Sequence, residues 1–271
     1  MNIDILREKE IFLFDMDGTI YVEDQLIDGS LELLDKLRDN NKKYIFLTNN
    51  SSKNVKTYLE KLRVLNINAS VENIFTSSQA TAIYLKDRFK NPKVYCVGTK
   101  DFREELKEYE IEVSDEDYID YSVDCVVVGF DTELNYKKVT IACELISSGK
   151  PFIATNMDLV CPIKNKKFIP DCGAICNMIK EAVGVEPQYI GKPNKNMIEI
   201  ISTKFNINKD KMVVVGDRLY TDIAIGVNAN IDSICVLTGE TKISDIESSD
   251  IKPTFVMQSV KDILNILTSI E

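Results

Sequence analysis

The chain has 271 residues, 44% of them apolar, so it can bury a substantial core in one large domain or in two smaller ones. Its 43 acidic and 33 basic residues give a formal net charge of −10, which argues against a general nucleic-acid surface. The sequence contains no histidine, which excludes an imidazole base, a phosphohistidine and a His-ligated metal. An anionic substrate would therefore need a locally cationic pocket built without histidine.

The charged start of the chain and its cysteines indicate the compartment. The first ten residues include Asp4, Arg7 and Glu8, so they do not form the apolar core of a signal peptide, and no apolar run approaches membrane-spanning length. Seven cysteines, an odd number in mostly apolar surroundings, indicate reduced core thiols rather than a disulfide framework. We therefore expect a cytoplasmic protein with no membrane partner.

Three of the cysteines raise the alternative of a zinc site, namely Cys161, Cys172 and Cys176. Cys172 and Cys176 fall in one expected helix, and the sequence offers neither a histidine nor a CxxC pair as further ligands. Buried thiols are the simpler interpretation.

Short apolar runs alternate with amphipathic segments along the chain. Runs that are apolar throughout fit strands buried on both faces of a parallel sheet, and they cover residues 11–14, 44–47, 126–128, 213–215 and 234–237. Helices are expected between them: Ser30 can cap one, Asn135 can start a second, and Asn194 opens a third. This alternation predicts an α/β fold.

The first polar motif follows the first expected strand and reads Asp15-Met16-Asp17-Gly18-Thr19. A strand that ends in two carboxylates places them at the carboxyl edge of a parallel sheet, where open α/β folds bind ligands, and Gly18 allows a sharp turn there. An acidic turn without a ligand explains this composition about equally well.

The second motif, Thr48-Asn49-Asn50-Ser51-Ser52, also follows a strand and precedes a helix expected from near Lys53. Hydroxyl and amide groups at a helix N-terminus can hold a phosphate, because the free N–H groups and the helix dipole both favour an anion. Taken alone, simple helix capping by Ser51 or Ser52 is the stronger explanation.

Two more motifs follow later strands. Gly191-Lys192-Pro193-Asn194 offers a lysine that could supply a point charge to a phosphoryl group, although most lysines beside turns are only solvated. The stretch from Gly216 to Asp222 adds Asp217 at a strand end and Asp222 one turn into the next helix, where two carboxylates can share a hard cation. A capping role for Asp222 is the alternative.

Taken together, these motifs resemble one family. The order Asp15-x-Asp17-Gly18-Thr19, Thr48, Lys192 and Gly216-Asp217-x4-Asp222 is similar to the haloacid dehalogenase superfamily over nearly the whole chain. Three further stretches resemble its 4-nitrophenylphosphatase and NagD-like nucleotidase branch, namely Ala154-Thr155-Asn156-x-Asp158, Cys172-Gly173-Ala174 and Tyr189-Ile190-Gly191-Lys192-Pro193. The resemblance implies a Rossmann-like, doubly wound parallel-sheet core with an inserted α/β cap of the C2 type.

The resemblance also implies a role for each motif residue. Asp15 would be the nucleophile and Asp17 the general acid and base. Mg²⁺ would be held by the carboxylates of Asp15 and Asp217 and the backbone carbonyl of Asp17, with Asp222 in the outer shell. The phosphate ligands would be Thr48, Asn49, Asn50 and Lys192. The dehalogenases of the family lack the second aspartate, so Asp17 indicates phosphoryl chemistry.

The spacing of the motifs predicts where the cap is inserted. The interval from Asp17 to Thr48 has room only for a flap and one helix, whereas the interval from Thr48 to Lys192 exceeds one crossover by roughly a hundred residues. We expect a core of residues 1–77 and 186–271 with a cap of residues 78–185.

Within the expected cap, Asn156 and Asp158 follow a strand-like run and could reach the leaving group, although Asx-turns explain them about equally well. The loop between Asp158 and Pro170 does not identify a particular member of the branch, so the substrate stays open among nucleotides, pyridoxal phosphate, sugar phosphates and glycerol phosphate. A homodimer formed through the cap is a further hypothesis.

The sequence thus predicts Mg²⁺-dependent hydrolysis of small phosphate monoesters, including 4-nitrophenyl phosphate, through an aspartyl-phosphate. A phosphotransferase or phosphomutase would use the same core residues and differ only in the acceptor. A regulatory protein that is phosphorylated without turnover is the alternative of another class, and it is disfavoured by the acid–base placement of Asp17 and by the size of the cap.

Overall fold

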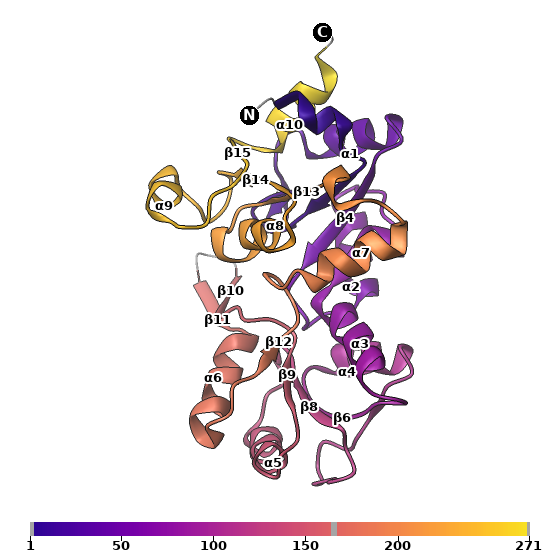
Figure 1. Ribbon diagram of the computed structural model, residues 1–271, viewed down its shortest axis with the longest axis vertical. Coiled ribbons are helices and arrows are strands. Elements are labelled where there is room, and N and C mark those ends of the chain that lie inside the picture. Colours follow the sequence, from indigo (N-terminus) through magenta and orange to yellow (C-terminus); the bar gives the residue numbers. More distant parts are fainter. Residues whose placement is uncertain (1–2, 164–166, 270–271) are drawn as a thin grey trace. The chain divides into compact units, whose positions relative to one another are not determined.

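Two parallel sheets organise the chain, one in each of two units (Figure 1). The computed structural model describes residues 3–163 and 167–269. The first unit contains the residues up to Thr48, the segment Leu59–Phe75 and the residues from Lys192 on, and the second contains Asn49–Tyr58 and Thr76–Gly191. The segment Asn49–Tyr58 thus groups with the second unit, although the sequence placed it in the core. The division into an independent core and cap stays a prediction.

The first unit is built on a six-stranded sheet in the order β15-β14-β13-β1-β4-β5. Its strands are β1 (Ile11–Phe14), β4 (Lys43–Thr48), β5 (Ile74–Thr76), β13 (Met212–Gly216), β14 (Asp232–Val236) and β15 (Phe255–Met257). β1 pairs in parallel with β4 and with β13, and parallel pairing continues from β13 through β14 to β15. The central strands are buried on both faces, which confirms the interpretation of their apolar runs.

Helices and a small hairpin complete the first unit. The helices are η1 (Ile3–Glu8), α1 (Ser30–Asp39), η2 (Val71–Asn73), α7 (Asn196–Phe205), η3 (Lys209–Lys211), η4 (Leu219–Ile223), α8 (Ala224–Ala229), α9 (Ile243–Ser248) and α10 (Val260–Thr268). Helix α2 (Val55–Val64) is divided between the units, with its residues from Leu59 on in the first. The hairpin pairs β2 (Tyr21–Val22) with β3 (Gln25–Leu26). Figure 1 shows α1 beside α10 and α7 beside α8.

The start of α1 differs from the expectation. The residue before the helix is Gly29, with φ of 84°, and no side chain caps the helix. The Ser30 hydroxyl instead donates to the carbonyl of Ile20 at 2.9 Å, because it points back to the loop that follows β1. The prediction of Ser30 as the capping residue was therefore wrong, while the helix itself begins there.

The second unit has its own five-stranded sheet in the order β12-β9-β8-β6-β7. Its strands are β6 (Lys93–Val97), β7 (Glu112–Val113), β8 (Cys125–Val128), β9 (Phe152–Ala154) and β12 (Gln188–Tyr189), and a separate antiparallel hairpin joins β10 (Val160–Ile163) to β11 (Lys167–Pro170). Its helices are α3 (Ser77–Arg88), α4 (Lys100–Glu108), α5 (Tyr136–Ser147) and α6 (Cys172–Val183). The Asn135 side chain accepts from the N–H of Lys138, which confirms the predicted start of α5.

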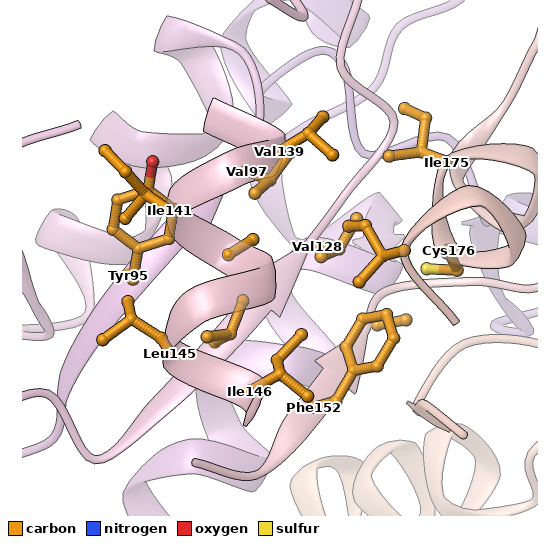
Figure 2. Packing of buried hydrophobic residues seen from close by; sticks show 14 of the residues in the cluster. Tyr95, Val97, Val128, Val139, Ile141, Leu145, Ile146, Phe152, Ile175 and Cys176 are labelled. Atoms are coloured by element: carbon orange, nitrogen blue, oxygen red, sulfur yellow. The ribbon is translucent and has the colours of Figure 1, made fainter. Parts of the chain in front are cut away.

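The core of the second unit lies between its sheet and the helices α5 and α6 (Figure 2). Val128 of β8 and Leu145 of α5 are fully buried in it. Burying a side chain of this size stabilises the fold by about 1.5–3 kcal/mol. Cys172 and Cys176 of α6 belong to the same core, with their sulfur atoms 3.9 Å apart. Five of the seven cysteines are buried, and these pack as small apolar groups.

The observed architecture confirms the predicted α/β class. Among residues 3–163 and 167–269, no helix is both long enough and apolar enough to cross a membrane.

Candidate active site

The topology of the first sheet brings three predicted motifs to one edge. β1 lies between β4 and β13, and Phe14 is in register with Phe46 on one side and Val215 on the other. The residues that follow these positions, Asp15 among them, therefore leave the sheet at the same level. The N–H of Asp15 donates to the carbonyl of Val215 at 2.8 Å, which fixes the start of the first loop.

Lys192 joins two of the aspartates at this edge. Its Nζ donates to Asp15 Oδ1 at 2.6 Å, to Asp222 Oδ1 at 2.7 Å and to the carbonyl of Leu47 at 2.9 Å. The lysine side chain is only 3% exposed. Lys192 therefore orients the Asp15 carboxylate and supplies a fixed positive charge beside it.

Asp15, Asp217 and Asp222 form a carboxylate cluster, in which each offers an oxygen within 4.8 Å of the others. Burial is the main reason that the pKa of Asp15 rises to about 8, and the charges of Asp222 and Asp217 add to it against the opposing effect of Lys192. Burial and the Asp222 charge likewise raise the pKa of Asp217 to about 6. Both pKa values are raised although nearby cations oppose the rise, Lys192 at Asp15 and both Arg218 and Lys192 at Asp217, so a further cation would favour the charged form of these carboxylates.

The surroundings of Asp217 show that the cluster fits a cation. Asp217 Oδ2 accepts the N–H of Glu240 at 2.7 Å, while Oδ1 is buried with no hydrogen-bond partner among the described residues. A Cβ atom added at Gly239 would lie 1.9 Å from Oδ2, and a Cβ atom added at Gly18 would lie 2.6 Å from the same oxygen. Oxygen donors alone, with one buried oxygen left for a ligand, suit a hard divalent cation.

Among the described residues, the Asp17 carboxylate does not belong to this cluster. It follows Asp15 in a tight loop, in which Gly18 has φ of 88° and donates its N–H to the carbonyl of Tyr21 at 2.8 Å. The hydroxyl of Thr238 donates to the carbonyl of Gly18 at 2.6 Å and holds the loop from the end of β14. The Asp17 side chain is 65% exposed, so it is accessible to a substrate.

Thr48 ends β4 and is buried, but the asparagines that follow it belong to the second unit. There, Asn49 Nδ2 donates to Asp158 Oδ2 at 2.9 Å, and the carbonyl of Asn49 accepts the hydroxyl of Ser77 at 2.6 Å. Asn50 Oδ1 accepts the N–H of Ser52 at 2.9 Å. The Asn49 side chain therefore joins this loop to Asp158, and the Asn50 side chain shapes the loop itself.

Helix capping does not explain the serines of this loop. α2 begins at Val55, and Asn54 Oδ1 accepts the N–H of Thr57 at 3.0 Å in the capping position. The hydroxyl of Ser51 instead accepts the N–H of Phe130 at 2.8 Å. The alternative of capping by Ser51 or Ser52 was therefore wrong.

Asn156 and Asp158 form a buried network within the second unit. Asn156 Nδ2 donates to Asp158 Oδ2 at 3.0 Å and to Asp171 Oδ1 at 3.2 Å. Asn156 is fully buried and Asp158 is 5% exposed. These contacts link the loop after β9 to Asn49 and to the start of α6, which gives both residues a structural role. Their predicted contact with substrate stays a prediction.

Several site residues were missed by the sequence analysis. Thr238, Gly239 and Glu240 follow β14 and contact the loops of Gly18 and Asp217. The signal was available, because a polar, glycine-containing stretch after an apolar strand is the pattern that identified the other motifs. Lys61, 3.6 Å from Asp17 Oδ1, had no such signal, since it lies within an amphipathic helix.

Comparison with known proteins agrees with this geometry. The family model for haloacid dehalogenase-like hydrolases matches residues 12–112, and a second, HAD-hydrolase-like model matches residues 189–263. The acid sugar phosphatase of Staphylococcus epidermidis is 34% identical, with 95% of this chain and 96% of that protein covered.

Solved structures show the same relationship. The 4-nitrophenylphosphatase of Thermotoga maritima is 40% identical, with a TM-score of 0.91 over 96% of this chain and 98% of that one. A putative NagD protein is 37% identical, with a TM-score of 0.88 over 95% of this chain and 98% of that one. These matches confirm the Rossmann-like core with an inserted α/β unit and the branch that the motifs resembled. The chain belongs to the haloacid dehalogenase-like hydrolases and is a phosphatase of their 4-nitrophenylphosphatase and NagD-like branch.

Proposed function

We propose that the protein hydrolyses phosphate monoesters of small metabolites through a covalent phosphate on Asp15. The observation that carries this proposal is the position of Lys192 between Asp15 and Asp222, with Asp217 in the same cluster. A carboxylate held by a buried lysine at the open edge of a parallel sheet is placed to attack a phosphoryl group. The names of the relatives favour a sugar phosphate as the natural substrate and 4-nitrophenyl phosphate as a test substrate.

Phosphate monoesters hydrolyse very slowly unaided, so the site must position the reactants and balance their charge. In the proposed reaction Asp15 attacks phosphorus, and Lys192 keeps the carboxylate in place and faces the phosphoryl oxygens. Thr48, at the end of β4, would donate to another of these oxygens. Asn49 and Asn50 follow Thr48 directly in the chain, and we retain them as proposed phosphate ligands.

Mg²⁺ is the proposed cofactor, and the carboxylates of Asp15 and Asp217 and the backbone carbonyl of Asp17 would hold it, with Asp222 behind them. When bound, it would offset the repulsion between an anionic nucleophile and an anionic phosphoryl group. The buried Oδ1 of Asp217 supports this assignment.

Asp17 would move the protons. Its exposed carboxyl group would protonate the leaving oxygen, and the resulting carboxylate would take a proton from the water that cleaves the acyl phosphate. Asp17→Asn should therefore impair turnover most for substrates with poor leaving groups. The substrate role of Asn156 and Asp158 and a homodimer formed through the second unit remain hypotheses of the same kind.

The fate of the phosphoryl group separates hydrolysis from its alternatives. We would incubate the protein with Mg²⁺ and a panel of phosphorylated metabolites, with and without an acceptor alcohol, and measure free phosphate and phosphorylated acceptor. Hydrolysis predicts free phosphate in many turnovers, whether or not an alcohol is present. Transfer to the alcohol would favour a phosphotransferase, and a single stoichiometric event without turnover would favour a regulatory protein. Excess EDTA should abolish release, and Asp15→Asn is the inactive control.

A further inference from the structure

Lys61 reaches from α2 to the side chain that we assign as the acid and base. Its Nζ lies 3.6 Å from Asp17 Oδ1 and 3.8 Å from the centre of the Tyr21 ring. The lysine side chain is 28% exposed, so most of it is shielded from solvent. An ammonium group over an aromatic face is held by the ring quadrupole as well as by the carboxylate.

Tyr21 is the fixed part of this arrangement. It is fully buried, lies in β2 and donates its hydroxyl toward Asp17 Oδ2 at 3.5 Å. The backbone of the same loop ties Tyr21 to Gly18, whose N–H donates to the Tyr21 carbonyl at 2.8 Å. The two oxygens of Asp17 are therefore approached from two sides, by the Lys61 ammonium and by the Tyr21 hydroxyl.

Such a restraint matters because Asp17 is the most exposed of the predicted carboxylates of the site, at 65%. A free aspartate at this exposure would sample several rotamers, and only one can place its oxygen within hydrogen-bond reach of a leaving group. Restricting the rotamer before the substrate arrives lowers the entropic part of the barrier.

We propose that Lys61, braced on the Tyr21 ring, is a positioning residue that holds the Asp17 carboxyl group for proton transfer to the leaving group. The inference rests on the proposed acid role of Asp17. It predicts an effect on kcat rather than on KM, since positioning of a proton donor acts in the transition state.

The test compares Lys61→Met, Lys61→Arg and Tyr21→Phe on two substrates in saturating Mg²⁺. Lys61→Met should lower kcat about tenfold for an alkyl phosphate and less than about twofold for 4-nitrophenyl phosphate, whose leaving group needs little protonation. Lys61→Arg should recover most of the loss because it keeps the charge over the ring. Tyr21→Phe keeps the ring and removes the hydroxyl, so its effect should be smaller than that of Lys61→Met.

Lys56→Met is the matched control, because Lys56 lies on the same helix, is 78% exposed and pairs with Glu108.

A double-mutant cycle with Asp17→Asn separates positioning from a direct role of the lysine. If Lys61 acts through Asp17, adding Lys61→Met to Asp17→Asn should cause no further loss of kcat. A further tenfold loss in that background would overturn the inference and indicate that Lys61 contacts the substrate itself. Equal losses on both substrates, with a lowered melting temperature, would also overturn it. If Asp17→Asn alone affected both substrates equally, the proposed acid role of Asp17 would fail, which is a different result.

Discussion

The Lys192 ammonium lies 2.6 Å from Asp15 Oδ1, although 177 residues separate the two in the chain. The same ammonium contacts Asp222 at 2.7 Å, and all three groups belong to one edge of the first sheet. Since the lysine is almost fully buried, its charge is screened little by solvent and acts mainly on these carboxylates. The pair therefore fixes the Asp15 carboxylate at this edge, and in the proposed reaction it also positions the nucleophile.

Replacing Lys192 by Met should lower both the stability of the protein and its turnover. Without the lysine, buried carboxylates lose their charge partner, so the free energy of unfolding should fall by about 3 kcal/mol in the absence of Mg²⁺. Added Mg²⁺ should restore part of this stability, while turnover stays near background. Thermal unfolding with and without Mg²⁺ measures the effect. Lys195→Met, which removes an exposed lysine nearby, is the control and should change neither property. An unchanged unfolding temperature in Lys192→Met would show that the cluster does not depend on the lysine.

Asp217→Asn should remove the response to Mg²⁺. A ligand that binds only the folded state raises the unfolding temperature, so the unaltered chain should be stabilised as Mg²⁺ is added. The variant loses one carboxylate charge beside the cation and should show little stabilisation. Asp210→Asn, an exposed aspartate of the same unit, should respond like the unaltered chain. A full Mg²⁺ response in Asp217→Asn would contradict the assigned cation site without any reference to activity.

Gly239→Ala tests the space that the cation site requires. The new methyl group would lie 1.9 Å from Asp217 Oδ2, which is too close for the carboxylate to keep its position. We expect turnover to fall at least about a hundredfold, with loss of the Mg²⁺ response, because small displacements of catalytic groups are costly. Thermal unfolding and phosphate release measure the two effects. Gly98→Ala, which crowds Phe102 in the second unit, is a steric control whose effect should appear in stability rather than in Mg²⁺ binding.

The buried carboxyl group of Glu105 should make the free energy of unfolding depend on pH, independently of the aspartate cluster. It lies in α4, is 2% exposed, and its pKa rises from 4.5 to about 8 because of burial, with a smaller contribution from the charge of Glu108. The unfolded chain ionises this group at lower pH than the folded chain. Its stabilising effect is therefore complete below pH 4.5 and is lost as the pH rises toward 8, by a few kcal/mol in total.

Glu105→Gln should flatten that dependence. We would measure chemical unfolding between pH 5 and 9 in saturating Mg²⁺, which, at the proposed site, would keep the aspartates of the cluster ionised. Relative to the unaltered chain, the variant should gain stability as the pH rises. Glu104→Gln, its exposed neighbour, should leave the curve unchanged. Parallel curves for the unaltered chain and Glu105→Gln would show that the buried carboxyl does not titrate in this range.

The strands and the core of the site could be predicted from sequence for a physical reason. Runs such as 11–14 and 213–215 are apolar throughout because both faces of their strands are buried, and parallel strands place their following residues at one edge. The sequence alone therefore predicts that Asp15 and Asp217 lie close together.

Other features depend on tertiary contacts that leave no local pattern. Lys61 is one of two lysines on the amphipathic helix α2, and its position beside the Tyr21 ring and Asp17 distinguishes it from Lys56. Asn156 has the same composition whether it faces a substrate or, as observed, donates to Asp158 and Asp171. The capping position of α1 is occupied by Gly29 rather than by Ser30, and this likewise depends on where the Ser30 hydroxyl finds its acceptor.

The most direct test of the central claim is to trap the phosphate on the protein. Acid quenching during the first turnover, followed by mass spectrometry of the fragments, should find phosphate on the peptide that contains Asp15, and borohydride should reduce the modified aspartate to homoserine. Asp15→Asn should show neither product. Turnover with no covalent phosphate at any quench time, or phosphate on another residue, would contradict the account.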